Sequence, residues 1–283
     1  MNLEFAKMHG LGNDFMVIDL VSQDFCVTSE HIGAWADRRT GIGFDQLLII
    51  EPPTEPDADF RYRIYNANGE EVEQCGNGAR CVAKFIWLRM LSPKQSLQLE
   101  TLGGPIQTCR LDEHTVEIDL GVPRNAPTDV PYSVAAACPG QVENALTYQL
   151  QCEATQYELT PVSIGNPHGV MFVADIAEAP VEKLGAQLVK HPFFPQGANI
   201  GFCQIVDPGF ARLRVFERGV GETRACGTGA CAAVVAGQLA GKLGQRVKIS
   251  LPGGKVRVSW QGPDTPVRLA GSASLVYEGQ ISI

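Results

Sequence analysis

The sequence has few charged residues and no long apolar run. Charged residues make up 19% of the 283 positions, below the ~25% of an average soluble protein. No stretch reaches the ~20 apolar residues that a membrane-spanning helix needs. The longest near-apolar run, Ala225 to Ala240, is interrupted by Thr228 and Gln238, so it predicts a helix buried in protein.

Basic side chains are also scarce. The 23 Lys and Arg residues face 31 Asp and Glu residues, which leaves a net charge of -8. This balance lacks the basic footprint of a nucleic-acid-binding protein. Residues 1–5 lack the basic segment and apolar core of a signal peptide. We therefore expect a cytoplasmic protein that acts on a small polar ligand and binds neither nucleic acid nor membrane.

The nine cysteines lack the spacing of metal-binding or disulfide-rich modules. They are odd in number and spread over a long chain, and the cytosol keeps thiols reduced. The pairs Cys75/Cys81 and Cys226/Cys231 do not have the short Cys-x2-Cys spacing of structural zinc modules. We expect no metal site, and we interpret Cys81 and Cys231 as small buried hydrophobic residues.

The sequence is internally duplicated. An offset of 151 aligns residues 63–66 with 214–217 and residues 75–79 with 226–230. Shorter matches in the same order pair residues 11–13 with 164–166, 43–46 with 201–204, and 103–104 with 253–254. The duplication predicts two halves of one fold. We place them at 1–124, completed by a C-terminal strand at 272–283, and at 125–271, with an insertion near 133–157.

Each half has the pattern of an α+β fold. Alternating apolar and polar residues predict half-buried strands, for example at 61–65 and 96–100 in the first half and at 212–216 and 247–251 in the second. Helix-length apolar segments follow at 79–91 and 230–243. We predict two pseudo-symmetric halves, each an antiparallel sheet curved around a central helix, with the active site in the cleft between them.

Cys75 and Cys226 occupy the same place in the two halves, directly before Gly-x-Gly and a predicted helix. The electropositive first turn of a helix stabilises a thiolate, so we expect a lowered pKa and a base near neutral pH. Free N–H groups at 76–78 and 227–229 are suited to holding a carboxylate. Two such groups fit a 1,1-proton transfer, in which one thiolate removes a proton from a carbon and the other thiol supplies one to the opposite face.

Four segments carry a resemblance to a known family. They are Phe5 to Phe15, Glu73 to Cys81, Gly165 to Gly169, and Glu217 to Gly229, which contains the string Ala-Cys-Gly-Thr-Gly. These motifs closely resemble those of the diaminopimelate epimerases, and the similarity runs from Met8 to Gly279.

The resemblance implies an isomerase that interconverts LL- and meso-2,6-diaminopimelate, a step of amino-acid biosynthesis that serves lysine and peptidoglycan precursors. It also implies that the reaction uses no cofactor and, in particular, no pyridoxal phosphate. Cys75 and Cys226 match the family's base and acid, and His168 and Glu217 match groups that tune these two thiols. It also implies a homodimer, with Tyr277 near the subunit contact. The implied substrate contacts are Asn13, Gln46, Asn66, Gly76, Asn77, Asn166, Asn199, Glu217, Arg218, Gly227 and Thr228.

These residue types also suit the substrate without reference to the family. Diaminopimelate has two carboxylates and two ammonium groups, which an Arg, several amides and one carboxylate complement.

Three other interpretations stay open. A proline or hydroxyproline racemase would share the two cysteines, but it has no need of the extra groups for a second zwitterionic end. A thiol–disulfide oxidoreductase would favour Cys-x-x-Cys in one loop, which is absent. A non-enzymatic amino-acid-binding protein would need no thiol in each half.

Overall fold

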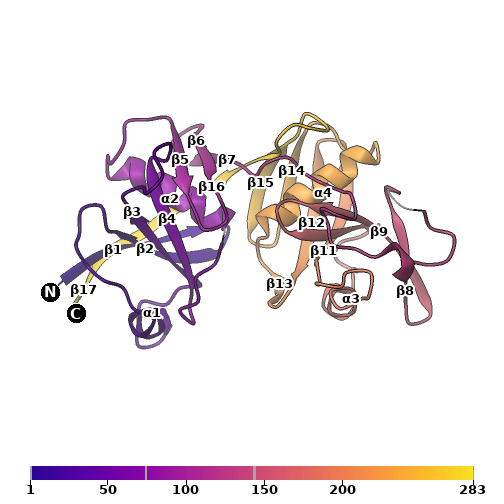
Figure 1. The fold of residues 1–283 in the computed structure, drawn as a ribbon, viewed down its shortest axis with the longest axis horizontal. Helices are drawn as coiled ribbons and strands as arrows, with labels where there is room; N and C mark the ends of the chain where they lie inside the picture. Colours follow the sequence, from indigo (N-terminus) through magenta and orange to yellow (C-terminus); the bar gives the residue numbers. More distant parts are fainter. Residues whose placement is uncertain (1, 74, 143–144, 283) are drawn as a thin grey trace. The chain divides into compact units, whose positions relative to one another are not determined.

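The computed structural model describes residues 2–73, 75–142 and 145–282. It divides the chain into two compact units (Figure 1). Unit 1 comprises Met1–Asp119 and Ala270–Ile283, and unit 2 comprises Leu120–Leu269. The chain passes from unit 2 back to unit 1 within strand β16 (Arg268–Ser272).

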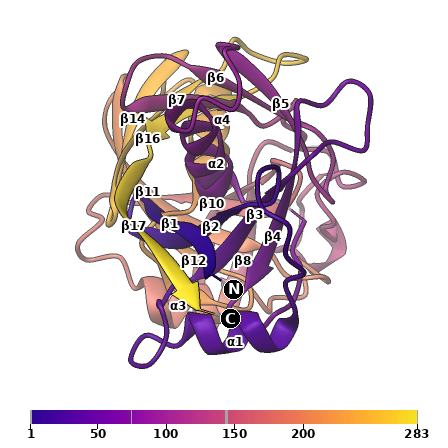
Figure 2. The same ribbon diagram turned by 90° about the vertical axis from the view of Figure 1, so that its left-hand side faces the viewer.

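Unit 1 is built on one curved sheet around a helix. Its strands pair in the order β17-β1-β2-β3-β4-β5-β6-β7. Because β1 pairs antiparallel with β17, the two ends of the chain lie side by side in this unit (Figure 2). The elements are β1 (Asn2–Gly10), β2 (Asn13–Asp19), α1 (Ser29–Ala36), β3 (Gln46–Glu51), β4 (Phe60–Asn66), α2 (Gly76–Leu88), β5 (Ser96–Glu100), β6 (Ile106–Arg110), β7 (Thr115–Asp119) and β17 (Ser274–Ser282).

Helix α2 is the centre of unit 1. It contacts strands at both ends of the sheet, β17 and β1 at one end and β6 and β7 at the other. Its residues Ala79, Cys81, Val82 and Ile86 are fully buried. The sheet therefore curls around the helix, as the apolar segment after Cys75 predicts.

Unit 2 repeats this plan. Helix α4 contacts β9, β10, β11, β12 and β15, and it consists largely of buried Ala and Val. The elements are η1 (Val134–Ala136, a 3₁₀ turn), β8 (Tyr148–Cys152), β9 (Thr155–Ser163), β10 (Pro167–Phe172), α3 (Val181–Leu188), β11 (Asn199–Asp207), β12 (Phe210–Glu217), β13 (Gly221–Thr223), α4 (Gly227–Leu239), β14 (Arg246–Leu251) and β15 (Gly254–Ser259).

Strand pairing shows that the two units share one topology. From β1 to β6 the successive pairs are antiparallel, parallel, antiparallel, parallel and antiparallel. The strands β9, β10, β11, β12, β14 and β15 pair in the same sequence. The sheets are thus mixed, whereas we expected antiparallel ones. In each unit the parallel pairs are joined by long crossover segments, two of which contain the central helices, and such connections allow parallel pairing.

The strand register corrects one alignment inferred from sequence. In unit 1, Gln46 lies opposite Phe15, two residues after Asn13. In unit 2, Asn199 lies opposite His168, two residues after Asn166. Gln46 therefore corresponds to Asn199, and the proposed match of residues 43–46 with 201–204 is wrong. Two short segments that both contain Gly-Phe aligned by composition, but backbone pairing sets the true correspondence.

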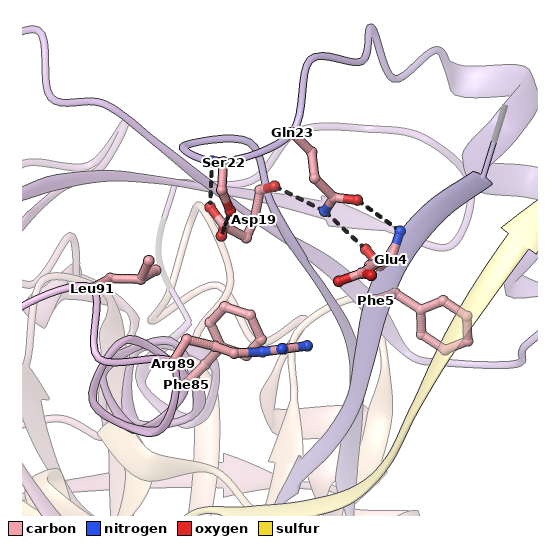
Figure 3. A pocket seen from close by; sticks show the side chains of 8 residues that line it. All are labelled: Glu4, Phe5, Asp19, Ser22, Gln23, Phe85, Arg89 and Leu91. Atoms are coloured by element: carbon pink, nitrogen blue, oxygen red, sulfur yellow. Dashed lines mark hydrogen bonds between the residues drawn. The ribbon is translucent and has the colours of Figure 1, made fainter.

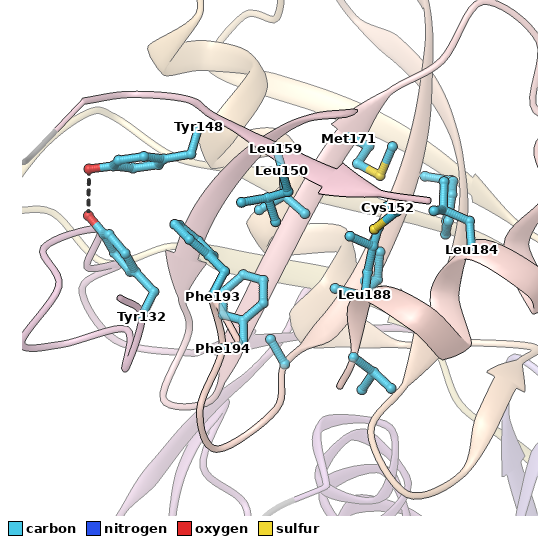
Figure 4. Packing of buried hydrophobic residues seen from close by; sticks show 14 of the residues in the cluster. Tyr132, Tyr148, Leu150, Cys152, Leu159, Met171, Leu184, Leu188, Phe193 and Phe194 are labelled. Carbon is cyan, nitrogen blue, oxygen red and sulfur yellow. Dashed lines mark hydrogen bonds between the residues drawn. The ribbon is translucent and has the colours of Figure 1, made fainter. Parts of the chain in front are cut away.

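The segment that we interpreted as an insertion supplies part of the core of unit 2. Tyr148 and Leu150 on β8 are fully buried, and β8 pairs with β9. The Tyr148 ring lies 5.2 Å from both the Tyr132 and the Phe193 rings, and the Tyr132 and Tyr148 hydroxyls are 3.2 Å apart (Figure 4). An aromatic cluster thus anchors this segment.

In the described part of the chain, no helix is long and apolar enough to cross a membrane.

Candidate functional site

In unit 1 the predicted polar residues lie at the ends of neighbouring strands. Asn13 begins β2, Gln46 begins β3 and Asn66 ends β4. Gln46 and Asn66 are directly opposite each other in the β3–β4 ladder, and Gln46 Nε2 donates to Asn66 Oδ1 at 3.0 Å. Three predicted substrate contacts thus lie at the same end of neighbouring strands in this sheet.

Cys75 caps the N-terminus of α2 beside these residues. Its Sγ accepts a hydrogen bond from the Gly78 N–H at 3.4 Å and lies 3.9 Å from Asn13 Oδ1. Gly76 and Asn77 form the first turn of the helix. Helix N-termini leave backbone N–H groups without helical partners, so this turn is suited to an anionic group.

In unit 2 the same pattern recurs. Asn166 directly precedes β10, Asn199 begins β11 and Glu217 ends β12. Asn199 Oδ1 accepts from the Arg218 N–H at 2.9 Å, and the Arg218 guanidinium donates to the Gln196 carbonyl at 2.8 Å. The Thr223 hydroxyl donates to the Glu217 carboxylate.

Cys226 occupies the N-cap position of α4, as Cys75 does in α2, but the surroundings of the two thiols differ. Cys226 is 4% exposed, and its Sγ lies 3.7 Å from the Thr228 hydroxyl. Burial raises the pKa of Cys226 well above its ordinary value, and the Glu217 carboxylate raises it further. The Thr228 hydroxyl and the Gly229 N–H act in the opposite direction without overcoming burial. The lowered pKa that we expected for this thiol is therefore wrong, because desolvation outweighs the helix N-terminus.

His168 is fully buried on β10, and its Nε2 lies 3.0 Å from Asn166 Oδ1. Burial lowers the pKa of His168 to about 3, so the imidazole is neutral at physiological pH. Nδ1 is buried and has no hydrogen-bond partner in the described structure.

The predicted residues correspond pairwise between the units. Asn13 corresponds to Asn166, Gln46 to Asn199, Asn66 to Glu217, Cys75 to Cys226 and Asn77 to Thr228. Each unit thus presents a cysteine together with amide groups at one end of its sheet. The main difference is a carboxylate, Glu217, where unit 1 has the neutral Asn66.

The sequence analysis missed a cluster of charged side chains next to Asn13. Arg38 binds the Asp14 carboxylate through both terminal nitrogens, at 3.0 and 2.7 Å, and also binds Asp45 at 2.7 Å. The Lys7 ammonium, 2.5 Å from Asp14, joins the same cluster. The sequence could have indicated this cluster, since Asp14 follows Asn13 directly and Asp45 directly precedes Gln46.

A second missed feature is an ion pair repeated in both units. Arg63 binds Glu71 at 2.8 Å, and at the same offset of 151 Arg214 binds Glu222 at 2.6 Å. Each pair ties its strand to the segment that leads to a cysteine cap. The aligned residues 63 and 214 already carried this signal.

A pocket of unit 1 lies elsewhere, between β1 and the end of α2 (Figure 3). Its volume is about 200 Å³, and Glu4, Asp19, Gln23, Phe85 and Arg89 are among its lining residues. None of the predicted site residues lines it.

Tyr277, the predicted dimer contact, lies on β17. Its side chain is 44% exposed, and its ring packs edge-on against Phe5 at 6.0 Å. Within the described ranges, no group of three or more His, Cys, Asp or Glu side chains is arranged to hold a metal ion.

Comparison with known proteins covers the whole chain. The family model described as diaminopimelate epimerase matches residues 5–125 and 160–276, and the unmatched residues 126–159 contain β8. The diaminopimelate epimerase of Pseudomonas aeruginosa strain LESB58 is 54% identical over 283 residues, and that of Stutzerimonas stutzeri strain A1501 is 50% identical; both alignments cover 100% of each chain.

Solved structures with lower sequence identity share the fold. A hydroxyproline epimerase from Agrobacterium vitis aligns with a TM-score of 0.69 at 15% identity, covering 99% of this chain and 92% of that chain. A methylitaconate-delta-isomerase aligns with a TM-score of 0.66 at 16% identity, covering 99% and 95%. The family model and the full-length relatives show that the chain belongs to the diaminopimelate epimerase family.

Proposed function

We propose that this chain is an isomerase that interconverts LL- and meso-2,6-diaminopimelate by proton exchange at an α-carbon. The observation that carries this proposal is the placement of one cysteine at the N-terminus of the central helix of each duplicated unit. Identity of 54% over the full length to a protein named diaminopimelate epimerase supplies the substrate class.

The two thiols take complementary roles in the proposed reaction. One, as the thiolate, removes the α-proton, and the other, as the thiol, delivers a proton to the opposite face of the same carbon. Burial and Glu217 raise the pKa of Cys226, so Cys226 enters as the thiol in the state described here. After one turnover the thiol that removed the proton is protonated and the other is a thiolate. In the reverse reaction the two cysteines exchange roles, and a reverse turnover restores the starting protonation of both.

The polar residues complement the rest of the substrate. The α-carboxylate suits the N–H groups at Gly76–Asn77 and Gly227–Thr228, which begin helices α2 and α4. Amides of Asn13, Gln46, Asn66, Asn166 and Asn199, with Glu217 and Arg218, suit the ammonium groups and the distal carboxylate. His168, which is neutral and buried, acts on this site by holding Asn166.

We also propose that each unit acts as a domain that supplies one of the thiols, and that the enzyme works as a homodimer in the cytoplasm. The cytoplasm keeps thiols reduced, which the mechanism requires.

Proton NMR in D₂O tests the proposed activity. With LL-diaminopimelate as the substrate, the α-proton signal should disappear as deuterium enters, and the meso isomer should accumulate. Proline and trans-4-hydroxyproline serve as comparison substrates, because a protein named hydroxyproline epimerase shares the fold. A silent diaminopimelate spectrum would overturn the proposal, and exchange with proline alone would assign the chain to the other activity.

A further inference from the structure

The amide of Asn13 is held from both sides. Its Nδ2 donates to Asp45 Oδ2 at 3.0 Å, while its Oδ1 accepts from Asn77 Nδ2 at 3.4 Å and lies 3.9 Å from Cys75 Sγ. An Asn side chain can turn its amide either way unless its partners differ in kind. Asp45 differs, because an ionised carboxylate can only accept. It therefore selects the orientation in which the Asn13 carbonyl faces the thiol.

Asn77 is oriented in the same way by Arg80. Asn77 is 6% exposed, and its Oδ1 accepts from Arg80 Nη2 at 2.7 Å. Arg80 is fully buried and also donates to the Gly76 carbonyl at 3.3 Å. A guanidinium can only donate, so the Asn77 oxygen must face it, and the Asn77 NH₂ group is directed towards Asn13.

Asp45 is itself fixed in position. Its Oδ1 accepts from Arg38 at 2.7 Å, and its Oδ2 accepts from the Asp14 N–H at 3.1 Å. The Asp45 N–H in turn donates to the Asp14 carbonyl at 2.9 Å. Each carboxylate oxygen thus accepts from different donors. An amide at this position would have only one oxygen acceptor.

We propose that Asp45 and Arg80 are positioning residues that act through Asn13 and Asn77 to keep a carbonyl oxygen, rather than an NH₂ group, directed at the Cys75 thiol. This inference rests on the proposed function, in which Cys75 transfers protons. A carbonyl accepts a hydrogen bond from the S–H form only, whereas an NH₂ group would stabilise the thiolate. The arrangement therefore controls how readily Cys75 gives up its proton.

The variant Asp45→Asn reverses the orientation. Arg38 keeps the new amide oxygen, because a charged donor forms the stronger hydrogen bond. The new NH₂ group then replaces Oδ2 and faces two donors, Asn13 Nδ2 and the Asp14 N–H, which were 3.0 and 3.1 Å from that oxygen. The backbone N–H cannot turn away, whereas the Asn13 amide can. If Asn13 keeps its orientation, its NH₂ group stays about 3.0 Å from the new NH₂ group. If Asn13 rotates, its NH₂ group instead faces the Asn77 NH₂ group at the longer distance of 3.4 Å. Asn13 therefore rotates, and its NH₂ group turns towards Cys75.

The experiment measures Cys75 alkylation by iodoacetamide as a function of pH, resolved by peptide mass spectrometry, in the full chain without substrate. Asp45→Ala controls for the lost negative charge, since it carries no donor and leaves Asn77 to hold the Asn13 oxygen. We expect the midpoint for Asp45→Asn to lie about 0.5–1 pH unit below that for Asp45→Ala, the effect of about one hydrogen bond to the thiolate. Asp59→Asn is the matched control for a carboxylate elsewhere in unit 1, where it binds Lys94 and the Gln98 N–H.

Coinciding midpoints for Asp45→Asn and Asp45→Ala, or a higher midpoint for Asp45→Asn, would overturn the proposal. If Asp45→Asn does not fold, Arg38→Gln provides a second test. This variant removes the donor to Asp45 Oδ1 but leaves Oδ2 hydrogen-bonded to Asn13. The alkylation midpoint of Arg38→Gln should therefore equal that of Asp59→Asn. A shift by Arg38→Gln as large as that expected for Asp45→Asn would contradict the orientation mechanism. The alkylation needs no turnover, so the orientation proposal and the proposed activity fail separately.

Discussion

At the scale of single residues, the two cysteines are equivalent in position and different in chemistry. Both occupy the N-cap position of a central helix, but Cys75 lies beside the neutral amide of Asn13, whereas Cys226 is buried beside the Glu217 carboxylate. The helix N-terminus is common to both thiols, so it cannot be the cause of this difference. For Cys226, burial and the Glu217 carboxylate favour the protonated thiol.

We expect Cys75→Ala and Cys226→Ala each to lower epimerisation by at least about 100-fold while the chain stays folded, because neither thiol can replace the other as acid or base. Activity is followed by the NMR assay and folding by circular dichroism. Cys81→Ala and Cys231→Ala are matched controls on the same helices, where both thiols are fully buried, and they should keep turnover. Residual activity above about a tenth in either catalytic variant would contradict the two-base mechanism.

We expect Glu217→Gln to lower the pKa of Cys226. The Glu217 carboxylate raises this pKa both by its charge and by hydrogen bonding to the thiol, so a neutral amide should lower the pKa. Thiolate absorbance in the ultraviolet measures the titration, with Cys226→Ala as the blank. Glu153→Gln, at an exposed glutamate of the same unit, should leave the curve in place. A pKa that stays or rises in Glu217→Gln would show that Glu217 does not act on this thiol.

At the scale of secondary-structure elements, close packing around the helix N-termini places the cysteines. Gly78 on α2 leaves no room for a side chain, since an added Cβ would overlap Tyr62 Oη and approach Leu48 to 3.2 Å. Tyr62 is 1% exposed and its hydroxyl donates to the Cys75 carbonyl at 3.4 Å. The Gly-x-Gly motif is therefore a packing requirement of this helix as well as a feature suited to anion binding.

We expect Gly78→Ala to lower the free energy of unfolding by about 1–3 kcal/mol, as overpacking of a core does. Gly33→Ala on α1 is the matched control, because a Cβ there meets nothing within 4 Å, and this change should raise the free energy of unfolding by about 0.5–1 kcal/mol. Denaturant titration measures both. In the Tyr62→Phe background the cost of Gly78→Ala should shrink, and an unchanged cost would show that the overlap lies elsewhere.

At the scale of the whole molecule, duplication explains how one fold places a cysteine at the same position in each unit, before the central helix. The strand pairing, the central helix and the Arg–Glu ion pair recur in both units. Each unit therefore positions its cysteine by the same local means, and only the side chains around the thiol have diverged.

We expect a homodimer in which β17 contributes to the contact. Leu275, Val276 and Tyr277 on this strand are 38%, 56% and 44% exposed, which is unusual for consecutive apolar side chains without a partner surface. Size-exclusion chromatography at micromolar concentration should give a dimer, and Tyr277→Ala should weaken it. Val220→Ala, at an exposed valine of unit 2, serves as the control. A monomeric wild type would exclude the dimer, whereas an unaffected dimer in Tyr277→Ala would exclude only this contact.

The sequence by itself was enough to identify the duplication, the two cysteines before the central helices, the α+β class and the family. These features depend on local patterns and motifs that can be recognised along the chain without its three-dimensional structure. Only the tertiary structure decided the register that matches Gln46 with Asn199, the parallel strand pairs, the direction of the Asn13 amide and the raised pKa of Cys226. Hydrogen-bond partners and burial come from residues far apart in the chain, such as Asn13, Asp45 and Asn77. Their combined effect on a thiol exists only once the backbone has brought them together.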